Sequence, residues 1–362
     1  MSRTAAPKSN GTAGEGEGTP VNSMNNSRMI VVNDAVSFVV PEGEIILDAA
    51  LSQGVVLPHQ CRGASCGMCK ARVTQGAVDN GWSLGLAISD QEMAEGYCLM
   101  CQARPMSAEV RLCTVQPIPG GEGSAVCSFE ARVLCNTPLT PRVRRVVVQA
   151  PDSAGFVAQA GAYVELALPG LSPHRRYSLA TMPARSGLIE LLVARHPGGA
   201  ASGHVHDLLQ PSDVVGVSGP YGTCRLPEGE GPVLGLAGGT GLAPVLSIME
   251  DALARGDASA MHLLFSVRDD GELMLMDRLA GLARMYPNFR YDLLVTESRS
   301  RFCPKQQYAP SWLRENHASL AGARAVIGGS PGFVAACSDA CVSLGMAQSA
   351  ISADSFTPVA PT

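Results

Sequence analysis

The sequence predicts a multidomain protein of mixed α+β and α/β class, on the basis of three observations along the chain. Valine-rich strands and a helix surround a cysteine cluster in the first part. Short strands separated by Gly and Pro fill the middle part, and strands alternate with helices in the last part. Because 362 residues exceed the size of one small domain, we expect these parts to fold as separate domains.

The composition indicates where the domains begin and end. We expect a disordered extension rich in Gly, Ser and Asn, a cysteine-containing domain, a Gly-rich linker, a small β-barrel and an α/β domain. Their predicted limits, in that order, are 1–28, 29–115, 116–124, 125–228 and 229–358.

The cysteine-containing domain opens with alternating apolar residues, which predict strands at 30–32 and 36–40. A helix is expected at 46–53. The cysteine loop follows, and a strand is expected after it at 70–74.

The cysteine spacing is the strongest chemical signal in this domain. Cys61, Cys66 and Cys69 lie close together, and a fourth cysteine follows after a long gap. This C-x4-C-x2-C…C spacing is typical of a plant-type [2Fe–2S] cluster, in which four thiolates converge on two irons. Zinc sites more often use two short-spaced pairs, and disulfides are unexpected without a secretory signal. Two cysteines could supply the fourth ligand, because Cys98 and Cys101 form a second C-x2-C pair.

Six short strands are expected in the middle domain, at 129–134, 142–149, 162–168, 177–180, 189–195 and 213–217. The Gly and Pro residues between these strands predict tight turns and hence a small antiparallel barrel, with one such turn at 219–222. The residues Arg, Tyr and Ser at 175–178 suit a pyrophosphate and a flavin ring, because a guanidinium pairs with phosphate. Glycines at 198–199 precede a helix expected at 204–209, whose N-terminal amides could hold a phosphate.

The last domain has a strand at 233–237 that leads through a Gly-rich turn into a helix at 243–255. Further strands at 262–267, 290–295 and 323–327 complete the βαβ rhythm of a parallel sheet, with ligands expected at the strand carboxyl ends. The turn suits a dinucleotide, but it lacks the strict G-x-G-x-x-G spacing, which disfavours an ordinary Rossmann dehydrogenase. A Gly-rich loop that binds no ligand is the alternative.

Charge and hydropathy limit the function classes. The net charge of −5 gives no indication of nucleic-acid binding. Residues 29–115 include nine acidic and five basic side chains, which suits docking to a basic patch on an acceptor but also fits a solvated acidic surface. No run of about eighteen apolar residues predicts a membrane span. Twelve cysteines without a secretory signal predict a reducing, cytoplasmic location.

The order of the motifs, from the cysteine cluster through RRYS, GGAAS, GPYG and GGTGLAP to GGSP, resembles the ferredoxin–NADP reductase superfamily. Over about residues 29–358 the chain is similar to the three-domain reductase components of bacterial ring-hydroxylating (Rieske) oxygenases. The resemblance implies a β-grasp [2Fe–2S] ferredoxin domain, an antiparallel β-barrel FAD domain and a parallel-sheet α/β NAD(P)-binding domain. It also implies Cys101 as the fourth ligand, because the Cys before Gln has that role in the family.

The resemblance assigns site residues at matching positions. The cluster ligands would be Cys61, Cys66, Cys69 and Cys101. FAD would be held by Arg175, Tyr177, Ser178, Arg195, Gly199 and Ser202. The nicotinamide nucleotide would be lined by Gly238, Gly239, Thr240, Gly241, Pro244, Arg268, Gly329 and Pro331. Phe356 would approach the flavin or serve in packing. Gly328 departs from the pattern, since many members have Cys there, and we expect a changed rate or coenzyme fit.

The sequence leaves the choice between NADH and NADPH open. Asp269 and Asp270 would repel a 2′-phosphate and favour NADH. The run Ser-Arg-Ser-Arg at 298–301, with Lys305 and Tyr308 nearby, could accept that phosphate, or it could be an exposed polar loop.

The resemblance implies an enzyme that passes electrons from NADH or NADPH through FAD and the [2Fe–2S] cluster to a protein acceptor. The acceptor would be a Rieske-type ferredoxin or a terminal oxygenase in the degradation of aromatic compounds. No catalytic acid or base is expected, because the cofactors supply the chemistry. The alternatives are a reductase for a diiron monooxygenase or a deoxysugar dehydratase, and a redox-responsive protein without turnover. We expect a monomer.

Overall fold

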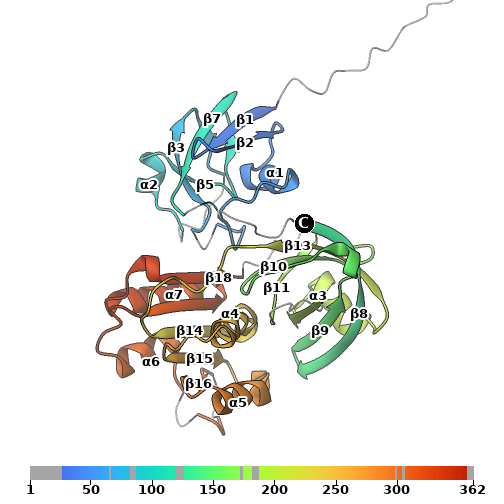
Figure 1. Ribbon diagram of the computed structural model, residues 1–362, viewed down its shortest axis with the longest axis vertical. Helices are drawn as coiled ribbons and strands as arrows, with labels where there is room; N and C mark the ends of the chain where they lie inside the picture. The colour runs from blue at the N-terminus through green and yellow to red at the C-terminus, as the bar shows by residue number, and fades with distance from the viewer. Residues whose placement is uncertain are drawn as a thin grey trace, which may run out of the picture.

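The computed structural model describes residues 27–64, 67–81, 87–116, 118, 126–171, 174–181, 187–297, 300–303 and 306–356. Three main sheets follow one another along the chain, and the first lies in a body that sits on the other two (Figure 1). The extension as far as residue 26 and most of the predicted linker lie outside the described residues. The predicted multidomain α+β and α/β class is confirmed.

The first body is built on a five-stranded sheet in the order β2-β1-β7-β3-β5. The strands are β1 (Arg28–Val32), β2 (Val36–Val40), β3 (Lys70–Gln75), β5 (Tyr97–Leu99) and β7 (Glu109–Thr114). The smaller elements are α1 (Ile46–Ser52), α2 (Asp90–Ala94), β4 (Val78–Asp79) and β6 (Arg104–Pro105). β1 runs parallel to β7 and antiparallel to β2, which is the β-grasp arrangement, and Leu47 of α1 packs with Ile30 of β1 in its core.

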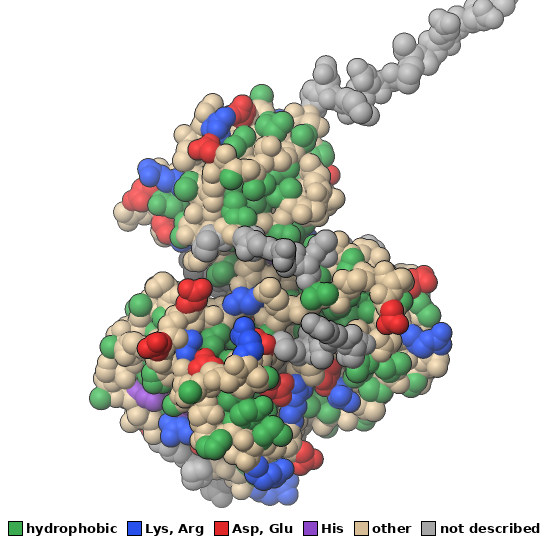
Figure 2. Space-filling model, in the orientation of Figure 1, with side chains coloured by type: hydrophobic (Ala, Val, Ile, Leu, Met, Phe, Trp, Pro, Cys, Tyr) green, Lys and Arg blue, Asp and Glu red, His purple; other side chains and the backbone are tan. Residues whose placement is uncertain are grey.

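Ion pairs offset part of the acidic charge of this body. Arg111 pairs with Asp34 at 2.7 Å and with Glu109 at 2.9 Å, and Lys70 pairs with Glu92 at 2.6 Å. On the face shown in Figure 2, basic and acidic side chains of this body lie next to one another. On that face, the negative charge is therefore interspersed with positive charge.

The second body is an antiparallel six-stranded sheet in the order β11-β10-β13-β8-β9-β12. The strands are β8 (Cys127–Thr140), β9 (Val143–Gln149), β10 (Tyr163–Ala167), β11 (Arg175–Ser178), β12 (Leu188–Ala194) and β13 (Val214–Tyr221). A bridge between Leu179 and Leu191 joins the two edge strands and closes the barrel. Helix α3 (Ala200–Asp207) is tied to β8, because the Asn136 side-chain amide donates to the Val205 carbonyl at 2.7 Å.

Two local predictions for the barrel are corrected. The turn expected at 219–222 is wrong for its first three residues, because Gly219 pairs with Cys127 and Tyr221 pairs with Tyr163 inside the sheet. The helix expected at 204–209 begins earlier, directly after Gly199. In both places glycine marks close backbone packing or a helix start, which composition alone does not distinguish from a turn.

The third body is a five-stranded parallel sheet in the order β16-β15-β14-β17-β18. Its strands are β14 (Val233–Gly238), β15 (Met261–Val267), β16 (Phe289–Val295), β17 (Arg324–Gly329) and β18 (Ile351–Ser355). Its helices are α4 (Leu242–Ala254), α5 (Met276–Met285), α6 (Ala309–Asn316) and α7 (Pro331–Ser343). The strand order reverses at β14, so the crevice for a ligand lies at the carboxyl end of that strand.

Helices cover both faces of this sheet. Val245 of α4 and Leu279 of α5 pack in one apolar cluster, and Leu313 of α6 and Cys337 of α7 pack in another. The first cluster also contains Leu192 of the barrel, so the second and third bodies share a core. None of the helices in the described ranges is long and apolar enough to cross a membrane.

Candidate cofactor-binding sites

The cysteine loop brings three of the four predicted cluster ligands to one place. Cys61, Cys69 and Cys101 are all buried, and the Cys101 thiol is hydrogen-bonded to Cys69 and lies within the electrostatic reach of Cys61. Cys66 lies outside the described residues. The Gly63 amide donates to the Cys61 sulfur at 3.4 Å, which is the kind of contact that supports a thiolate ligand. These residues therefore fit an iron–sulfur cluster.

Cys98 and Cys101 differ in their surroundings although they share one C-x2-C pair. The hydrogen bond from Cys69 lowers the pKa of the Cys101 thiol, and the Ala64 amide acts in the same direction. Burial raises the pKa of Cys98 to about 12, and its side chain is fully enclosed in the core of the first body. A metal ligand must be a thiolate, so this difference favours Cys101 over Cys98.

The predicted flavin residues lie on β11 and at the start of α3. Tyr177 packs against the barrel core, and burial raises the pKa of its phenol to about 12, so the ring stays neutral. Gly199 precedes α3 and has no side chain to cap it, so the first helical amides are open to a phosphate. Arg175 begins β11, and the Ser202 hydroxyl bonds to the Gly199 carbonyl at 3.1 Å. This set of donors and an aromatic ring fits a flavin nucleotide.

Asp354 is a buried carboxyl group next to these residues that the sequence did not indicate. It lies on β18, and the Ser178 hydroxyl donates to its Oδ2 at 2.6 Å. Burial raises the pKa of Asp354 to about 6, although hydrogen bonds from Ser178 and Gln60 lower it. The three residues come from three different bodies, so this carboxyl group marks the point where all of them meet.

Burial of the charged Asp354 carboxylate costs up to about 3 kcal/mol at pH 7, which is the free energy that corresponds to a pKa raised from 3.8 to about 6. Replacing Asp354 by Asn removes this cost and is expected to stabilise the protein by up to that amount. Because the folded-state pKa lies above the unfolded one, the folded state binds the proton more tightly, and wild-type stability falls as pH rises through this window. Denaturant unfolding between pH 4 and pH 7 measures the effect. An equal fall in the Asn variant would contradict this account.

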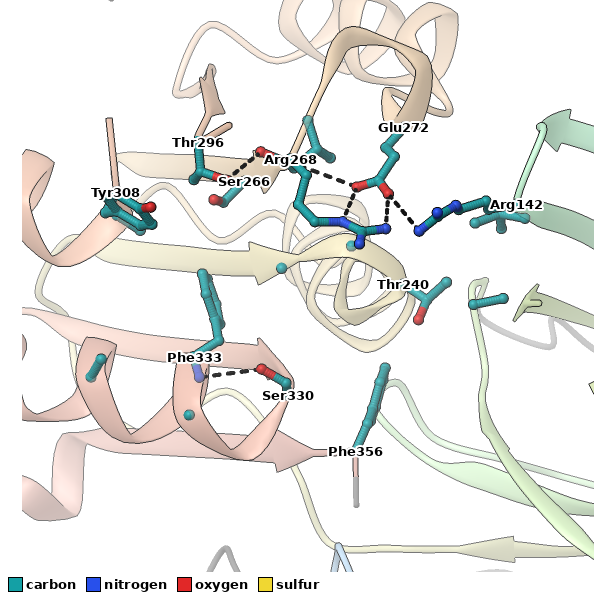
Figure 3. Close-up of a pocket in the computed structure, with 18 of the residues that line it drawn as sticks. Arg142, Thr240, Ser266, Arg268, Glu272, Thr296, Tyr308, Ser330, Phe333 and Phe356 are labelled. Atoms are coloured by element: carbon teal, nitrogen blue, oxygen red, sulfur yellow. Dashed lines mark hydrogen bonds and ion pairs between the residues drawn. The ribbon is translucent and has the colours of Figure 1, made fainter. Parts of the chain in front are cut away.

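A cavity of about 760 Å³ lies at the carboxyl end of β14, between the barrel and the parallel sheet (Figure 3). Six predicted residues line it, namely Arg195, Gly238, Gly239, Thr240, Arg268 and Phe356. Arg195, predicted for FAD, thus shares this cavity with residues predicted for the nicotinamide nucleotide. Four other residues predicted for that nucleotide, all within the described ranges, do not line the cavity: Gly241, Pro244, Gly329 and Pro331.

Two glycines behind the cavity pack backbone against backbone. A Cβ atom on Gly241 would lie 2.1 Å from the Gly328 carbonyl oxygen, and one on Gly328 would lie 2.4 Å from the Gly241 carbonyl oxygen. This close approach joins the turn after β14 to the end of β17. It also accounts for Gly328 at the position where many family members have Cys, because no side chain fits there in this chain.

Carboxylates neutralise the arginines of the cavity. Figure 3 shows Glu272 between Arg268 and Arg142, with a close ion pair to Arg268 and a 3.9 Å contact to Arg142 of the barrel. Arg195 forms two bonds to Asp207, at 2.6 and 2.7 Å. The Arg268 partner lowers the pKa of the Glu272 carboxyl, although burial raises it.

The two aspartates expected to face the nucleotide are used elsewhere. Asp269 accepts a hydrogen bond from the Gly271 amide at 2.8 Å, and Asp270 accepts one from the Arg301 amide at 2.9 Å. Neither aspartate lines the cavity, whereas Glu272 does. Of the proposed phosphate-binding run, Ser298, Arg299 and Lys305 lie outside the described residues, whereas Tyr308 lines the cavity.

Three family models match the chain in succession. They are a 2Fe-2S iron-sulfur cluster binding domain at residues 30–106, an oxidoreductase FAD-binding domain at 131–226 and an oxidoreductase NAD-binding domain at 236–339. Together they account for the three sheets, and they confirm that the chain binds a [2Fe–2S] cluster, FAD and a nicotinamide nucleotide.

Similar proteins are reductase components of oxygenase systems. The chain is 37% identical over 253 residues to the phenol 2-monooxygenase reductase component DmpP of Pseudomonas sp. strain CF600, covering 70% of this chain and 71% of that one. It is 31% identical over 277 residues to the toluate 1,2-dioxygenase electron transfer component of Pseudomonas putida, covering 75% and 80%. The crystal structure of the Amycolatopsis cytochrome P450 reductase GcoB matches with a TM-score of 0.78 at 31% identity, over 91% of this chain and 99% of that one. The chain therefore belongs to the three-domain, flavin-dependent iron–sulfur reductases of the ferredoxin–NADP reductase type that serve oxygenase systems.

Proposed function

We propose that this chain is the NADH-dependent reductase component of an oxygenase that acts on aromatic compounds. The observation that carries the choice of NADH is the pairing of Arg142, Arg195 and Arg268, the three arginines that line the described part of the cavity, with carboxylates. Recognition of a 2′-phosphate needs a cationic side chain that can turn toward it. Here the Glu272 carboxylate forms an ion pair with the Arg268 guanidinium and would repel a 2′-phosphate.

The bound cofactors supply hydride and single-electron chemistry, and the protein positions them. Tyr177 offers a neutral ring on β11, and the N-terminus of α3 offers amides to a phosphate. Thr240 and Phe356 both line the cavity, and Figure 3 draws them in the same part of the view. We therefore assign the carboxyl end of β14 to nicotinamide-nucleotide binding and the barrel strand β11 to FAD.

Replacing Glu272 by Gln is expected to raise kcat/KM for NADPH about tenfold, since a charged hydrogen bond contributes about 1.5 kcal/mol or more. The change leaves the Arg268 guanidinium unneutralised, and kcat/KM for NADH should stay nearly constant. Asp251→Asn is the matched control, because Asp251 pairs with Arg255 and does not line the cavity. Steady-state dye reduction with both coenzymes measures the effect. An unchanged preference in Glu272→Gln would exclude this carboxylate as the determinant.

The identity of the acceptor is a separate proposal. The 37% identity to a phenol 2-monooxygenase reductase, against 31% to a toluate dioxygenase component, supports a monooxygenase as acceptor. The Rieske-type ferredoxin or ring-hydroxylating oxygenase expected from the motifs is the second candidate, and the toluate component supports it. Reconstitution of hydroxylation with each type of oxygenase component separates the two.

The proposed electron route has a direct test. The purified protein should show flavin and iron–sulfur absorbance, and anaerobic NADH should bleach both. A colourless protein would contradict the proposal. Flavin and cluster bands that NADH and NADPH both leave unchanged would contradict it too, and would favour a redox-responsive protein without turnover.

A further inference from the structure

The outer face of the barrel at β10 is covered by the first body. Val164 and Leu166 point into the barrel core, so the alternating side chains Tyr163 and Glu165 point outward. Tyr163 is nevertheless only 3% exposed, because His59 of the cysteine loop meets its ring edge-on at a centroid distance of 6.2 Å. The first body therefore docks on this face.

The two residues before the first cluster ligand are buried between the outer face of the barrel and the segment that follows β13. His59 and Gln60 are 0% and 2% exposed. The Gln60 side-chain oxygen accepts hydrogen bonds from the Thr223 and Cys224 amides at 2.8 and 2.9 Å, and the Thr223 hydroxyl donates to the His59 carbonyl at 2.7 Å. Cys61 follows directly, so the position of this ligand depends on the insertion.

Glu165 adds an ionic contact at the same interface. One of its oxygens accepts from Arg62 of the cysteine loop at 2.6 Å and lies 3.3 Å from the Arg176 guanidinium on β11. Arg176 in turn donates to the Cys61 carbonyl at 3.3 Å. Arg176 stands between Arg175 and Tyr177, so a chain of hydrogen bonds links the proposed flavin strand to a cluster ligand.

Arg62 also makes a contact within the first body. The second terminal nitrogen of Arg62 donates to Asp48 of α1 at 2.7 Å. Arg62 and Glu165 are only 13% and 18% exposed, whereas Asp48 is 46% exposed. The contact between the bodies is therefore the better shielded of the two, and loss of its carboxylate would leave a mostly buried guanidinium with one partner fewer.

We propose that Glu165 is a positioning residue for electron transfer, which holds the cysteine loop against β11 and thereby fixes the distance between flavin and cluster. The inference rests on the proposed electron route. With both groups bound, one electron at a time would pass from reduced FAD, which is oxidised, to the cluster, which is reduced. No bond to the protein forms or breaks. Such a transfer depends steeply on separation and orientation, which are the quantities this contact sets.

The test compares Glu165→Gln with Asp48→Asn in the holoprotein. Both changes remove one carboxylate partner of Arg62, but only the first removes an ion pair between the first body and the barrel. Stopped-flow absorbance should show flavin reduction by NADH unchanged within about twofold in both variants, and cluster reduction slowed at least about tenfold in Glu165→Gln alone. Glu165→Asp should restore part of the rate, because it keeps the charge.

A second measurement does not depend on turnover. Hydrogen exchange at the Thr223 and Cys224 amides should become faster in Glu165→Gln and stay at the wild-type rate in Asp48→Asn, because these amides are protected by Gln60 of the docked loop. The electron paramagnetic resonance spectrum of the chemically reduced cluster should be the same in all variants. If Glu165→Gln fails to load FAD, Thr223→Val removes the hydroxyl bond to His59 and tests the same docking.

The possible failures are distinguishable. Equal cluster-reduction rates in wild type and Glu165→Gln, or equal slowing in Asp48→Asn, would overturn the role of Glu165 and leave the electron route intact. A wild-type protein whose cluster is not reduced through the flavin would instead overturn the proposed function.

Discussion

Replacing Cys101 by Ala should abolish the visible absorbance and the paramagnetic signal of the [2Fe–2S] cluster, whereas Cys98→Ala should leave both in place. The Cys101 thiol is hydrogen-bonded to Cys69, and this bond lowers the pKa of Cys101. Cys61 lies at the same site. Cys98 is enclosed in the apolar core, and burial raises its pKa to about 12. Only the first is suited to bind iron as a thiolate.

Each of these two variants is the control for the other, because both remove one buried sulfur from the first body. Cys98→Ala should cost about 1 kcal/mol of stability through a small cavity, and no cofactor should be lost. Flavin absorbance serves as the internal reference, since the FAD-binding domain matches residues 131–226, in the second body. A cluster that survives in Cys101→Ala and is lost in Cys98→Ala would reverse the assignment.

Gly241→Ala should remove NADH-dependent flavin reduction and lower the melting temperature of the protein. The new Cβ would lie 2.1 Å from the Gly328 carbonyl oxygen and 2.6 Å from the Gly329 nitrogen, both of which are backbone atoms of β17. These atoms can give way only if the strand shifts, and overpacking of this kind typically costs about 1–3 kcal/mol or more. The shift would also move the turn at the carboxyl end of β14, to which we assign nucleotide binding.

Gly281→Ala is the control for this substitution. Gly281 lies in α5, and nothing approaches a Cβ atom there within 4 Å. Alanine should therefore stabilise the helix by about 0.5–1 kcal/mol and leave NADH oxidation unchanged. Thermal unfolding and stopped-flow flavin reduction measure both variants. Wild-type values for Gly241→Ala would contradict the close packing of β17 on the turn.

Elements with a strong local pattern could be predicted from the sequence. The strands β14 and β15 are mostly apolar and almost entirely buried, as expected for a sheet covered on both faces, and the glycines after β14 indicated the nucleotide turn. Strand β18 was missed. Its sequence Ile-Ser-Ala-Asp-Ser includes three polar residues, and Asp354 has its hydrogen-bond partner Ser178 in the barrel, far away in the sequence.

Contacts between bodies could not be predicted, because they join residues far apart in sequence. Glu165 and Arg62 are separated by 103 positions, and Ser178 and Asp354 by 176. Glu272 lies four residues after Arg268, but this spacing predicts an ion pair only within an α-helix, and both residues lie between β15 and α5. Neither Glu272 nor Asp354 could therefore be assigned to a site before the fold was known.

The covered outer face of β10 and β13 has a consequence for how such reductases are assembled in evolution. A chain that lost its first body would present the rings of Tyr163 and Tyr221 and the carboxylate of Glu165 to water. Exposed aromatic patches of this kind promote association between molecules. Loss of the first body by gene fission would therefore need compensating substitutions on these two strands. We expect the cysteine loop and this barrel face to be inherited as one unit, so that exchange of either between reductases requires exchange of both.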